Sequence, residues 1–179
     1  MAMLRTAILV LVAALCAACD KSPLGPSAPE ATFLSLVSGP SDPVGQAFSW
    51  QYTLENATFQ ASFDRRYNHV HMAAIELDGG RTWRLDVTAP AGEALTPGRA
   101  YHDVMLYSAG TQQPQLGMDF TRFTAFRLCS RVRGQFVLHE LVIGPGDTLD
   151  RFHASFVQFC NDAPTSLTGE VRIVANPWR

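Results

Sequence analysis

Hydrophobic and polar residues alternate through the last part of the chain, and this pattern predicts three neighbouring antiparallel strands. A β-prone run over residues 134–143 ends at 144–147, where glycine and proline favour a turn. The chain returns through 149–160 and alternates again over 167–173, so we expect one buried and one wet face. The face expected to be buried carries Phe152, Ala154, Phe156, Cys160, Leu167, Gly169, Val171 and Ile173, with Asp150 and Gln158 as polar exceptions.

Two cysteines flank the first turn of this three-stranded unit. Cys129 precedes the outgoing strand and Cys160 ends the return strand, so antiparallel pairing brings them together. A bond between them closes a loop of about thirty residues and stabilises the fold by roughly 3.5 kcal/mol in the chain-entropy model. Such a bond requires an oxidising compartment, and two buried free thiols are the alternative. We therefore predict a disulfide between these two cysteines.

Short β-prone runs also fill the chain before this unit, and none has a convincing helical period. The Asp-Gly-Gly sequence at 78–80 separates two of these runs and predicts a hairpin. The expected strands cover 32–37, 48–54, 57–63, 68–77, 81–88, 100–107 and 116–128, the last as one bent strand or two short ones. Two runs place large apolar side chains on one face, namely Phe48, Trp50, Tyr52 and Leu54 in one and Trp83, Leu85 and Val87 in the other.

The number and spacing of these runs indicate the fold class. About nine or ten strands occupy about 145 residues, with a turn signal roughly every 8 to 14 positions. Parallel pairing requires crossovers of a dozen or more residues, which the pattern lacks. We therefore predict an all-β fold, a single antiparallel β-sandwich with one intradomain disulfide, for which a barrel-like closure is the alternative.

The start of the chain has the composition of an export signal. A positive charge precedes an apolar core over 7–15, and the whole apolar run over 7–18 is well short of the roughly twenty residues that a spanning helix needs. Residues 15–19 (Leu-Cys-Ala-Ala-Cys) resemble the lipobox of bacterial lipoproteins, with Cys16 where leucine is usual. The resemblance implies that Cys19 is acylated and becomes the new N-terminus. Ordinary cleavage followed by free secretion is the alternative.

These features divide the chain into three parts. Residues 1–18 are the expected lipoprotein signal peptide, 19–31 the lipidated cysteine with a tether rich in proline and serine, and 32–179 the β-sandwich domain. Acyl chains bind membranes by burying methylene groups at about 0.8 kcal/mol each. We therefore expect a protein of the bacterial cell envelope, lipid-anchored to a membrane, with its domain in the periplasm or at the cell surface. The choice between inner and outer membrane stays open.

The amino-acid composition and net charge limit the kinds of partner that the protein can bind. Hydrophobic residues make up 47% of the chain and charged residues 17%, which is typical of a globular protein. A formal net charge of −2 provides no basic surface for nucleic acid. The expected partners are therefore the membrane, through the N-terminal lipid, and an unknown protein or glycan, without nucleic acid.

Short motifs in the C-terminal half suggest a relationship to a known kind of domain. They are 98–101 (Gly-Arg-Ala-Tyr), Cys129, 134–137 (Gly-Gln-Phe-Val) with Glu140, 151–152 (Arg-Phe), 156–160 (Phe-Val-Gln-Phe-Cys) and 167–172 (Leu-Thr-Gly-Glu-Val-Arg). Over residues 98–174 this set resembles an uncharacterised β-sandwich module of secreted bacterial proteins. Many such modules carry an asparagine beside the first cysteine and a histidine before the second, whereas this chain has Leu128, Ser130 and Phe159. The resemblance implies the sandwich and the disulfide, and no activity.

One pair of histidines has the spacing of metal ligands. His69 and His71 lie at i and i+2 of an expected strand, so both imidazoles project from the same face, as two ligands of zinc or copper do. A third ligand is missing locally, and His102, His139 or His153 would complete the site only through the fold. Two polar rings on a wet face are the commoner arrangement. We therefore expect no stoichiometric metal and no cofactor, with His69 and His71 as weak metal candidates.

The sequence contains no recognisable catalytic motif. A Gly-x-Ser-x-Gly elbow, a His-Glu-x-x-His helix and a phosphate-binding glycine loop are all absent. A carboxylate pair would form only if the fold gathered scattered acids, namely Asp86, Asp103, Asp119, Glu140 and Asp150. We therefore expect no catalytic residues.

Three tryptophans raise the question of sugar binding. Trp50 and Trp83 lie in phase with apolar strand neighbours, so we expect both in the core, whereas Trp178 lies beyond the last strand and is freer to bind a ligand. Our leading hypothesis is a membrane-anchored envelope lipoprotein of unknown specific role that acts as a non-catalytic binding or structural module. A glycan-binding module is the second hypothesis and an uncharacterised hydrolase the third.

Overall fold

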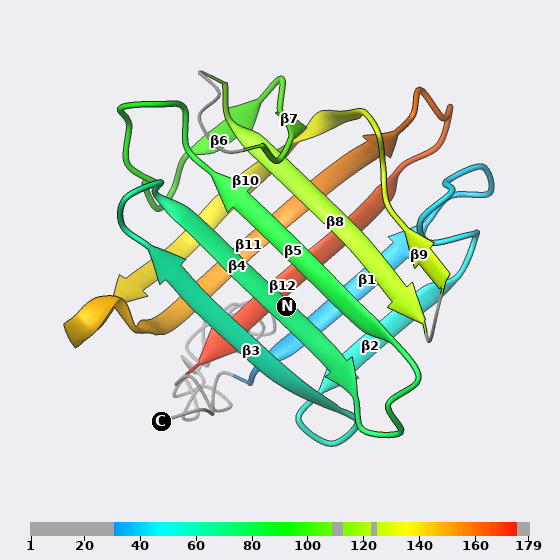
Figure 1. Cartoon of the computed structure of the whole chain (residues 1–179), viewed down its shortest axis with the longest axis horizontal. Helices are drawn as coiled ribbons and strands as arrows, with labels where there is room; N and C mark the ends of the chain where they lie inside the picture. The colour runs from blue at the N-terminus through cyan, green and yellow to red at the C-terminus, as the bar shows by residue number, and fades with distance from the viewer. Residues whose placement is uncertain (1–30, 109–112, 123–124, 175–179) are drawn as a thin grey trace, which may run out of the picture. The chain divides into compact units, whose positions relative to one another are not determined.

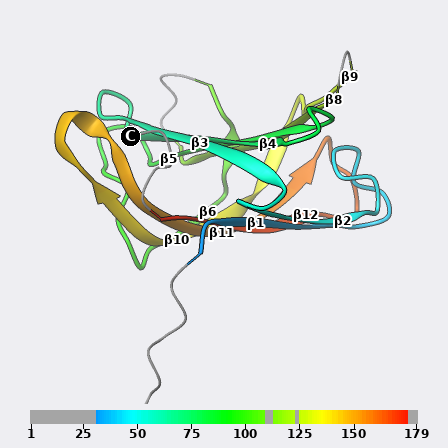
Figure 2. The same ribbon diagram turned by 90° about the horizontal axis from the view of Figure 1, so that it is seen from below.

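Two β-sheets packed face to face build the domain in the computed structural model, which describes residues 31–108, 113–122 and 125–174 (Figures 1 and 2). The described strands are β1 (Phe33–Ser38), β2 (Ser49–Thr53), β3 (Ala57–Asp64), β4 (His69–Glu76), β5 (Thr82–Thr88), β6 (Ala100–His102), β7 (Met105–Leu106), β8 (Gln115–Arg122), β9 (Ala125–Arg127), β10 (Val132–Ile143), β11 (Leu149–Cys160) and β12 (Leu167–Val174). Sheet A has the order β2-β1-β12-β11-β10-β6, and sheet B the order β3-β4-β5-β8-β7, with β9 paired to β8. The sheets do not close into a barrel, so the predicted β-sandwich is confirmed.

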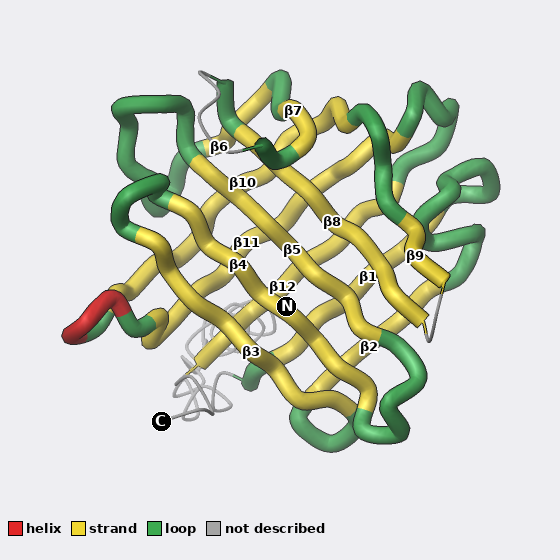
Figure 3. Tube along the Cα trace, in the orientation of Figure 1, coloured by secondary structure: helices red, strands yellow, loops and turns green. Residues whose placement is uncertain are grey.

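The strands of the two sheets run in different directions and cross when the domain is viewed through both layers (Figures 1 and 3). Seen from the side, β3, β4, β5 and β8 form one layer, and the strands of sheet A form the other (Figure 2). A core between crossed sheets is filled by the inward side chains of both. A single turn of 3₁₀ helix, Pro145–Asp147, joins β10 to β11. Within residues 31–108, 113–122 and 125–174, no helix has the length and apolarity that crossing a membrane requires.

The predicted three-stranded unit is present in sheet A as β10, β11 and β12. Antiparallel pairing places Val132 opposite Cys160 and Phe156 opposite Gly169. Cys129 and Cys160 form the predicted disulfide, with their Cα atoms 5.2 Å apart. The first strand of the domain, β1, pairs with β12, and β2 then lies beside β1. The beginning and the end of the described domain are therefore neighbours in one sheet.

The single strand predicted over 100–107 is instead two strands in different sheets. β6 pairs with β10 in sheet A, whereas β7 pairs with β8 in sheet B. Between them Asp103 has a positive φ of 53° and Val104 is buried, so the chain turns sharply and crosses from the edge of sheet A to the edge of sheet B. The pairing of β7 with β8 is parallel, which the sequence pattern did not predict. It is limited to two residues on each strand.

Of the two alternatives predicted for 116–128, two short strands are present, because β9 pairs back on β8. One further expectation is corrected in detail. The predicted apolar face of 48–54 is only partly buried, since Phe48 and Leu54 are 63% and 55% exposed. Both residues lie just outside β2, where the chain turns and the alternation of a strand no longer applies.

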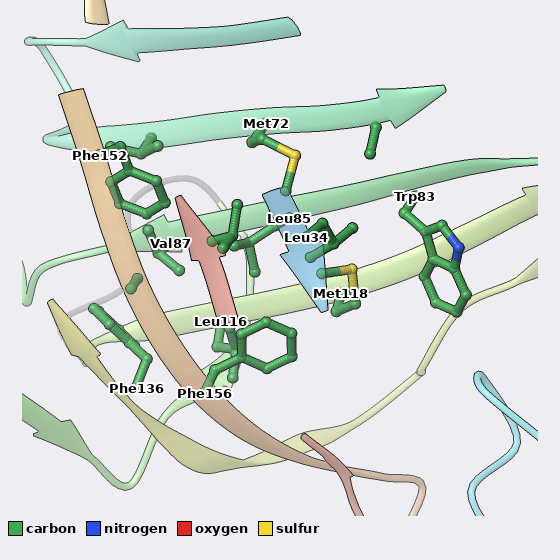
Figure 4. Packing of buried hydrophobic residues seen from close by; sticks show 14 of the residues in the cluster. Leu34, Met72, Trp83, Leu85, Val87, Leu116, Met118, Phe136, Phe152 and Phe156 are labelled. Carbon is green, nitrogen blue, oxygen red and sulfur yellow. The ribbon is translucent and has the colours of Figure 1, made fainter. Parts of the chain in front are cut away.

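The core lies between the sheets and is built from alternating positions of nearly every long strand (Figure 4). The largest fully buried side chains include Trp83, Phe59, Phe136, Phe152, Leu34 and Met72. A polar side chain, that of Gln158, is fully buried within this core on the inner face of β11. Its amide Oε1 accepts a hydrogen bond from the backbone N–H of Met118 (2.8 Å), and its Nε2 donates to the carbonyl of the same residue (3.0 Å). Gln158 therefore joins sheet A to β8 of sheet B.

Glycine is required at one position of the long hairpin. Gly134 in β10 has a φ of 152°, and a Cβ atom added there would lie 2.0 Å from the carbonyl oxygen of Val157 on β11. The two backbones can approach this closely only because position 134 carries no side chain.

Candidate functional site

The histidines of the i, i+2 motif lie on the outward face of sheet B. In the register of β4 with β5, His71 lies directly opposite Asp86, and His69 lies opposite Thr88. Asp86 is therefore the direct cross-strand neighbour of one histidine and the diagonal neighbour of the other. The residues that alternate with them, Val70, Met72, Leu85 and Val87, are fully buried. Strand geometry alone thus places three polar side chains together above the sheet.

One carboxylate oxygen joins the two imidazole rings. Asp86 Oδ1 lies 2.7 Å from His69 Nε2 and 2.8 Å from His71 Nδ1. The side chains of His69 and Asp86 are only 12% and 16% exposed, whereas that of His71 is 38% exposed. In the part of the chain that the structure describes, these three residues have ligand atoms that all lie within 4.8 Å of one another. The third residue that the sequence motif lacked is therefore Asp86.

Hydrogen bonding controls the protonation of this cluster. The hydrogen bond to Asp86 raises the pKa of His71 and outweighs the opposing effect of burial. Burial acts to raise the pKa of Asp86, but the hydrogen bonds and positive charge of His69 and His71 hold that pKa below its usual value. The cluster therefore favours an ionised carboxylate that accepts N–H bonds from both rings.

Tyr107 covers one side of the cluster. Its ring stacks on that of His69 with the centroids 4.4 Å apart and the planes 18° from parallel, and its hydroxyl oxygen lies 3.4 Å from His69 Nδ1. Burial raises the pKa of the Tyr107 phenol, and the charge of Asp86 adds to this effect.

Farther along the same face, Arg84 forms an ion pair with Asp119 at 3.5 Å. Burial raises the pKa of Asp119, although the charge of Arg84 acts to lower it.

A small hollow of about 140 Å³ lies beside Tyr107. Its walls include Tyr67, Asn68 and Gln115, and none of the residues that line it is a histidine or a carboxylate. The convergent histidines and Asp86 thus lie on the outward face of sheet B and do not line this hollow. Acid–base catalysis on a substrate held in the hollow has no support from its lining.

A second polar group lies on the outward face of sheet A. His139 Nε2 lies 2.9 Å from Ser155 Oγ, and His153 Nε2 lies 2.8 Å from Glu170 Oε1. Arg172 Nη2 donates to His153 Nδ1 (3.1 Å), so the ring nitrogen that carries the proton and faces Glu170 is Nε2. The ring centroids of His139 and His153 are 4.5 Å apart, and burial lowers the pKa of His139.

This second group does not form the relay of a serine hydrolase. Ser155 contacts one histidine and Glu170 contacts the other, whereas a triad needs one histidine between the hydroxyl and the acid. The acids singled out in the sequence do not form a carboxylate pair either. Their contacts are Asp86 with the two histidines, Asp119 with Arg84, Glu140 with Arg151 and Asp150 with Thr148, while Asp103 lies at the switch between sheets.

The remaining sequence candidates lie apart from the cluster. His102 is exposed and contacts Gln135 at 3.0 Å in sheet A. Trp83 is in the core, as expected, and Trp50 is half-buried with its ring 5.0 Å from that of Trp83. Trp178, Cys19 and the predicted signal peptide of 1–18 lie outside the described residues.

Comparison with protein-family models, with curated proteins and with solved structures found no match to this chain. The resemblance of residues 98–174 to a secreted bacterial module and the lipobox-like sequence therefore stay predictions.

Proposed function

We propose that this chain is a lipid-anchored protein of the bacterial cell envelope whose β-sandwich is a non-catalytic binding or structural module. The observation that carries the proposal is the disulfide between Cys129 and Cys160 inside the domain. Such bonds persist in the periplasm and outside the cell and are rare in the cytosol. The lipobox-like residues 15–19 and the tether that follows agree with the same destination.

The outward faces of the sandwich support binding over catalysis. Both histidine groups lie on open strand faces, where each histidine contacts an acid or a hydroxyl. A hydrolytic site would instead need a nucleophile, a base and an orienting acid gathered at one cleft.

The anchor is tested by Cys19→Ser in cells that process lipoproteins. We expect the variant to move from the membrane fraction to the soluble fraction, because the apolar run of 7–18 is shorter than a spanning helix and no acyl chain replaces it. The matched control is Cys16→Leu, which places the usual lipobox residue and should stay with the membrane. Immunoblots of both fractions after a high-salt wash provide the measurement. A Cys19→Ser protein that stays in the washed membranes contradicts the lipid anchor.

A further inference from the structure

The cluster on the outward face of sheet B has the donor set of a transition-metal site. Imidazole nitrogens and carboxylate oxygens are ligands that zinc and related divalent ions take in proteins, often with three protein ligands and an open position. His69 Nε2, His71 Nδ1 and Asp86 Oδ1 converge here, with the oxygen 2.7 and 2.8 Å from the nitrogens. We propose that these three residues bind one divalent transition-metal ion, for which Zn²⁺ is the probe. This site is independent of the proposed lipid anchor.

The geometry requires only a small adjustment. An ion bonded to nitrogen and oxygen at about 2.0–2.2 Å in tetrahedral geometry separates its ligand atoms by about 3.4 Å. His69 Nε2 and His71 Nδ1 must therefore move away from the carboxylate oxygen by roughly 0.7 and 0.6 Å. The two nitrogens, which lie within 4.8 Å of each other, must also stand about 3.4 Å apart, and side-chain rotation supplies these movements. His71 is free to make this movement because 38% of its side chain is exposed. The pairing of β4 with β5 keeps the backbone of the three residues in place while their side chains rotate.

Both histidines can give up the ring proton that faces Asp86. The nitrogens that face Asp86 must lose their protons before they bind the ion. In neutral His69 the proton moves to Nδ1, and the hydroxyl oxygen of Tyr107, 3.4 Å away, is placed to accept a hydrogen bond from it. In neutral His71 the proton moves to Nε2 of the exposed ring, and a histidine that starts with both protons releases one to solvent. The stacked Tyr107 ring also fixes the orientation of His69.

The residue of β8 that lies beside Asp86 has no side chain. The residue paired with Asp86 on that strand is Gly117, and a Cβ atom added there would meet only the Cβ of Tyr107, at 3.6 Å. Solvent reaches the cluster at His71, whose side chain is 38% exposed, so water or a ligand oxygen can take the remaining coordination positions from that side. An ion held by three protein ligands with open positions is suited to binding a further ligand from solution.

Sheet A provides a matched control for nonspecific binding by histidine. His139 and His153 also lie with their rings close together, but their Nε2 atoms face Ser155 and Glu170 separately, with no shared carboxylate oxygen between them. A variant of His139 thus removes one surface imidazole without changing the proposed ligands.

The experiment is a calorimetric titration of the full-length, untagged protein with ZnCl₂, after extraction in detergent and removal of metal with a chelator. We expect one ion per chain for the wild type and for His139→Ala. His71→Ala and Asp86→Asn each remove a ligand and should weaken binding at least about 100-fold, whereas Tyr107→Phe should weaken it about 10- to 100-fold, as loss of an outer-shell partner does. Zinc should also raise the thermal midpoint of the wild type and not that of His71→Ala.

Three results overturn the proposal. They are a wild type that takes up no zinc, full binding retained by His71→Ala, and loss of binding in His139→Ala while His71→Ala still binds. If Asp86→Asn does not fold, His71→Ala decides the matter, because its partly exposed ring can be removed without opening the core. A thermal unfolding curve of the metal-free His71→Ala protein checks that it is folded.

Discussion

At the scale of single residues, Gln158 shows how a buried polar side chain can serve the fold. Its amide makes two hydrogen bonds to the backbone of Met118, and its Nε2 also lies 3.3 Å from Cys129 Sγ. β7 pairs with only the first residues of β8, and β9 pairs with only the last ones. Gln158 therefore supplies hydrogen bonds to the middle of β8, where no neighbouring strand does so on that side.

We predict that Gln158→Leu lowers the free energy of unfolding by about 3 kcal/mol. The substitution leaves the buried N–H and C=O of Met118 without these partners, at about 1–3 kcal/mol each, and added apolar contact offsets part of the loss. Urea unfolding followed by circular dichroism measures the change. Gln135→Leu, an exposed position on β10, is the control and should change stability by less than about 1 kcal/mol. Equal effects of the two substitutions would exclude the role assigned to Gln158.

At the scale of elements, a chain of side chains connects β2 of sheet A to β4 and β5 of sheet B. Trp83 Nε1 donates to the hydroxyl oxygen of Tyr52 (3.1 Å), and that hydroxyl donates to Glu76 Oε1 (2.9 Å). Arg81 Nη1 donates to the same carboxylate oxygen at 2.7 Å. Burial, followed by smaller contributions from Glu76, raises the pKa of Tyr52 to about 12, against the lowering effect of the bond from Trp83.

This raised pKa predicts alkaline sensitivity. The unfolded chain loses the Tyr52 proton near pH 10, whereas the folded protein keeps it until about 12, so stability should fall progressively between these two values. Tyr52→Phe removes this contribution and should make the decline of unfolding free energy with pH shallower. Urea titrations at several pH values between 9 and 12 provide the measurement. Tyr67→Phe, on an exposed ring, should follow the wild type, and a Tyr52→Phe curve as steep as the wild type would be inconsistent with the assignment.

At the scale of the whole molecule, the disulfide links the segment that follows β9 to the end of β11. It spans 31 positions of the sequence and lies at the end of the longest strand pair of sheet A. Both sulfur-bearing residues are buried, and Gln158 lies against one of them. The bond therefore restricts the unfolded chain across the hairpin that carries much of the core.

We predict that reduction lowers the midpoint of thermal unfolding by about 10 °C while the fold survives at room temperature. A loop of this length contributes roughly 3.5 kcal/mol in the chain-entropy model, which is less than the whole stability of an ordinary domain. Thermal scans with and without reductant measure the shift. The double variant Cys129→Ala with Cys160→Ala is the control, because reductant should leave its midpoint unchanged. Two alkylatable thiols in the oxidised protein, or an unchanged midpoint on reduction, would contradict this prediction.

Local patterns were sufficient to predict much of the fold. The alternation in β11 and β12, the hairpin at 78–80 and the buried face of Trp83 are all present in the structure. Alternation is reliable because successive side chains of a strand point to opposite faces whatever the strand pairs with. The disulfide was predictable for a related reason, since a short turn leaves two flanking strands little choice but to pair with each other.

Only part of the candidate site could be predicted from the sequence. The i, i+2 spacing already placed His69 and His71 on one face, but Asp86 entered only with the register of β4 against β5. The turn at 78–80 contains a signal for that register, because a hairpin pairs residues at equal distances from its turn. Applied to His71, this rule points to the neighbourhood of Asp86 on the return strand. The alternation within β4 alone does not show which residue of β5 lies opposite His71.

Other features were decided only by tertiary structure. The split of 100–107 between two sheets, the parallel pairing of β7 with β8 and the hydrogen bonds of Gln158 to Met118 all depend on which sheet faces which. The physical reason is the distance along the chain between the residues that interact. Side-chain alternation and turn formation are set by a few neighbouring residues, so the sequence by itself determined most of the strands, most of their buried faces and the disulfide. Contacts between sheets depend on how both hydrophobic faces pack together, and only the complete fold brings those residues into contact.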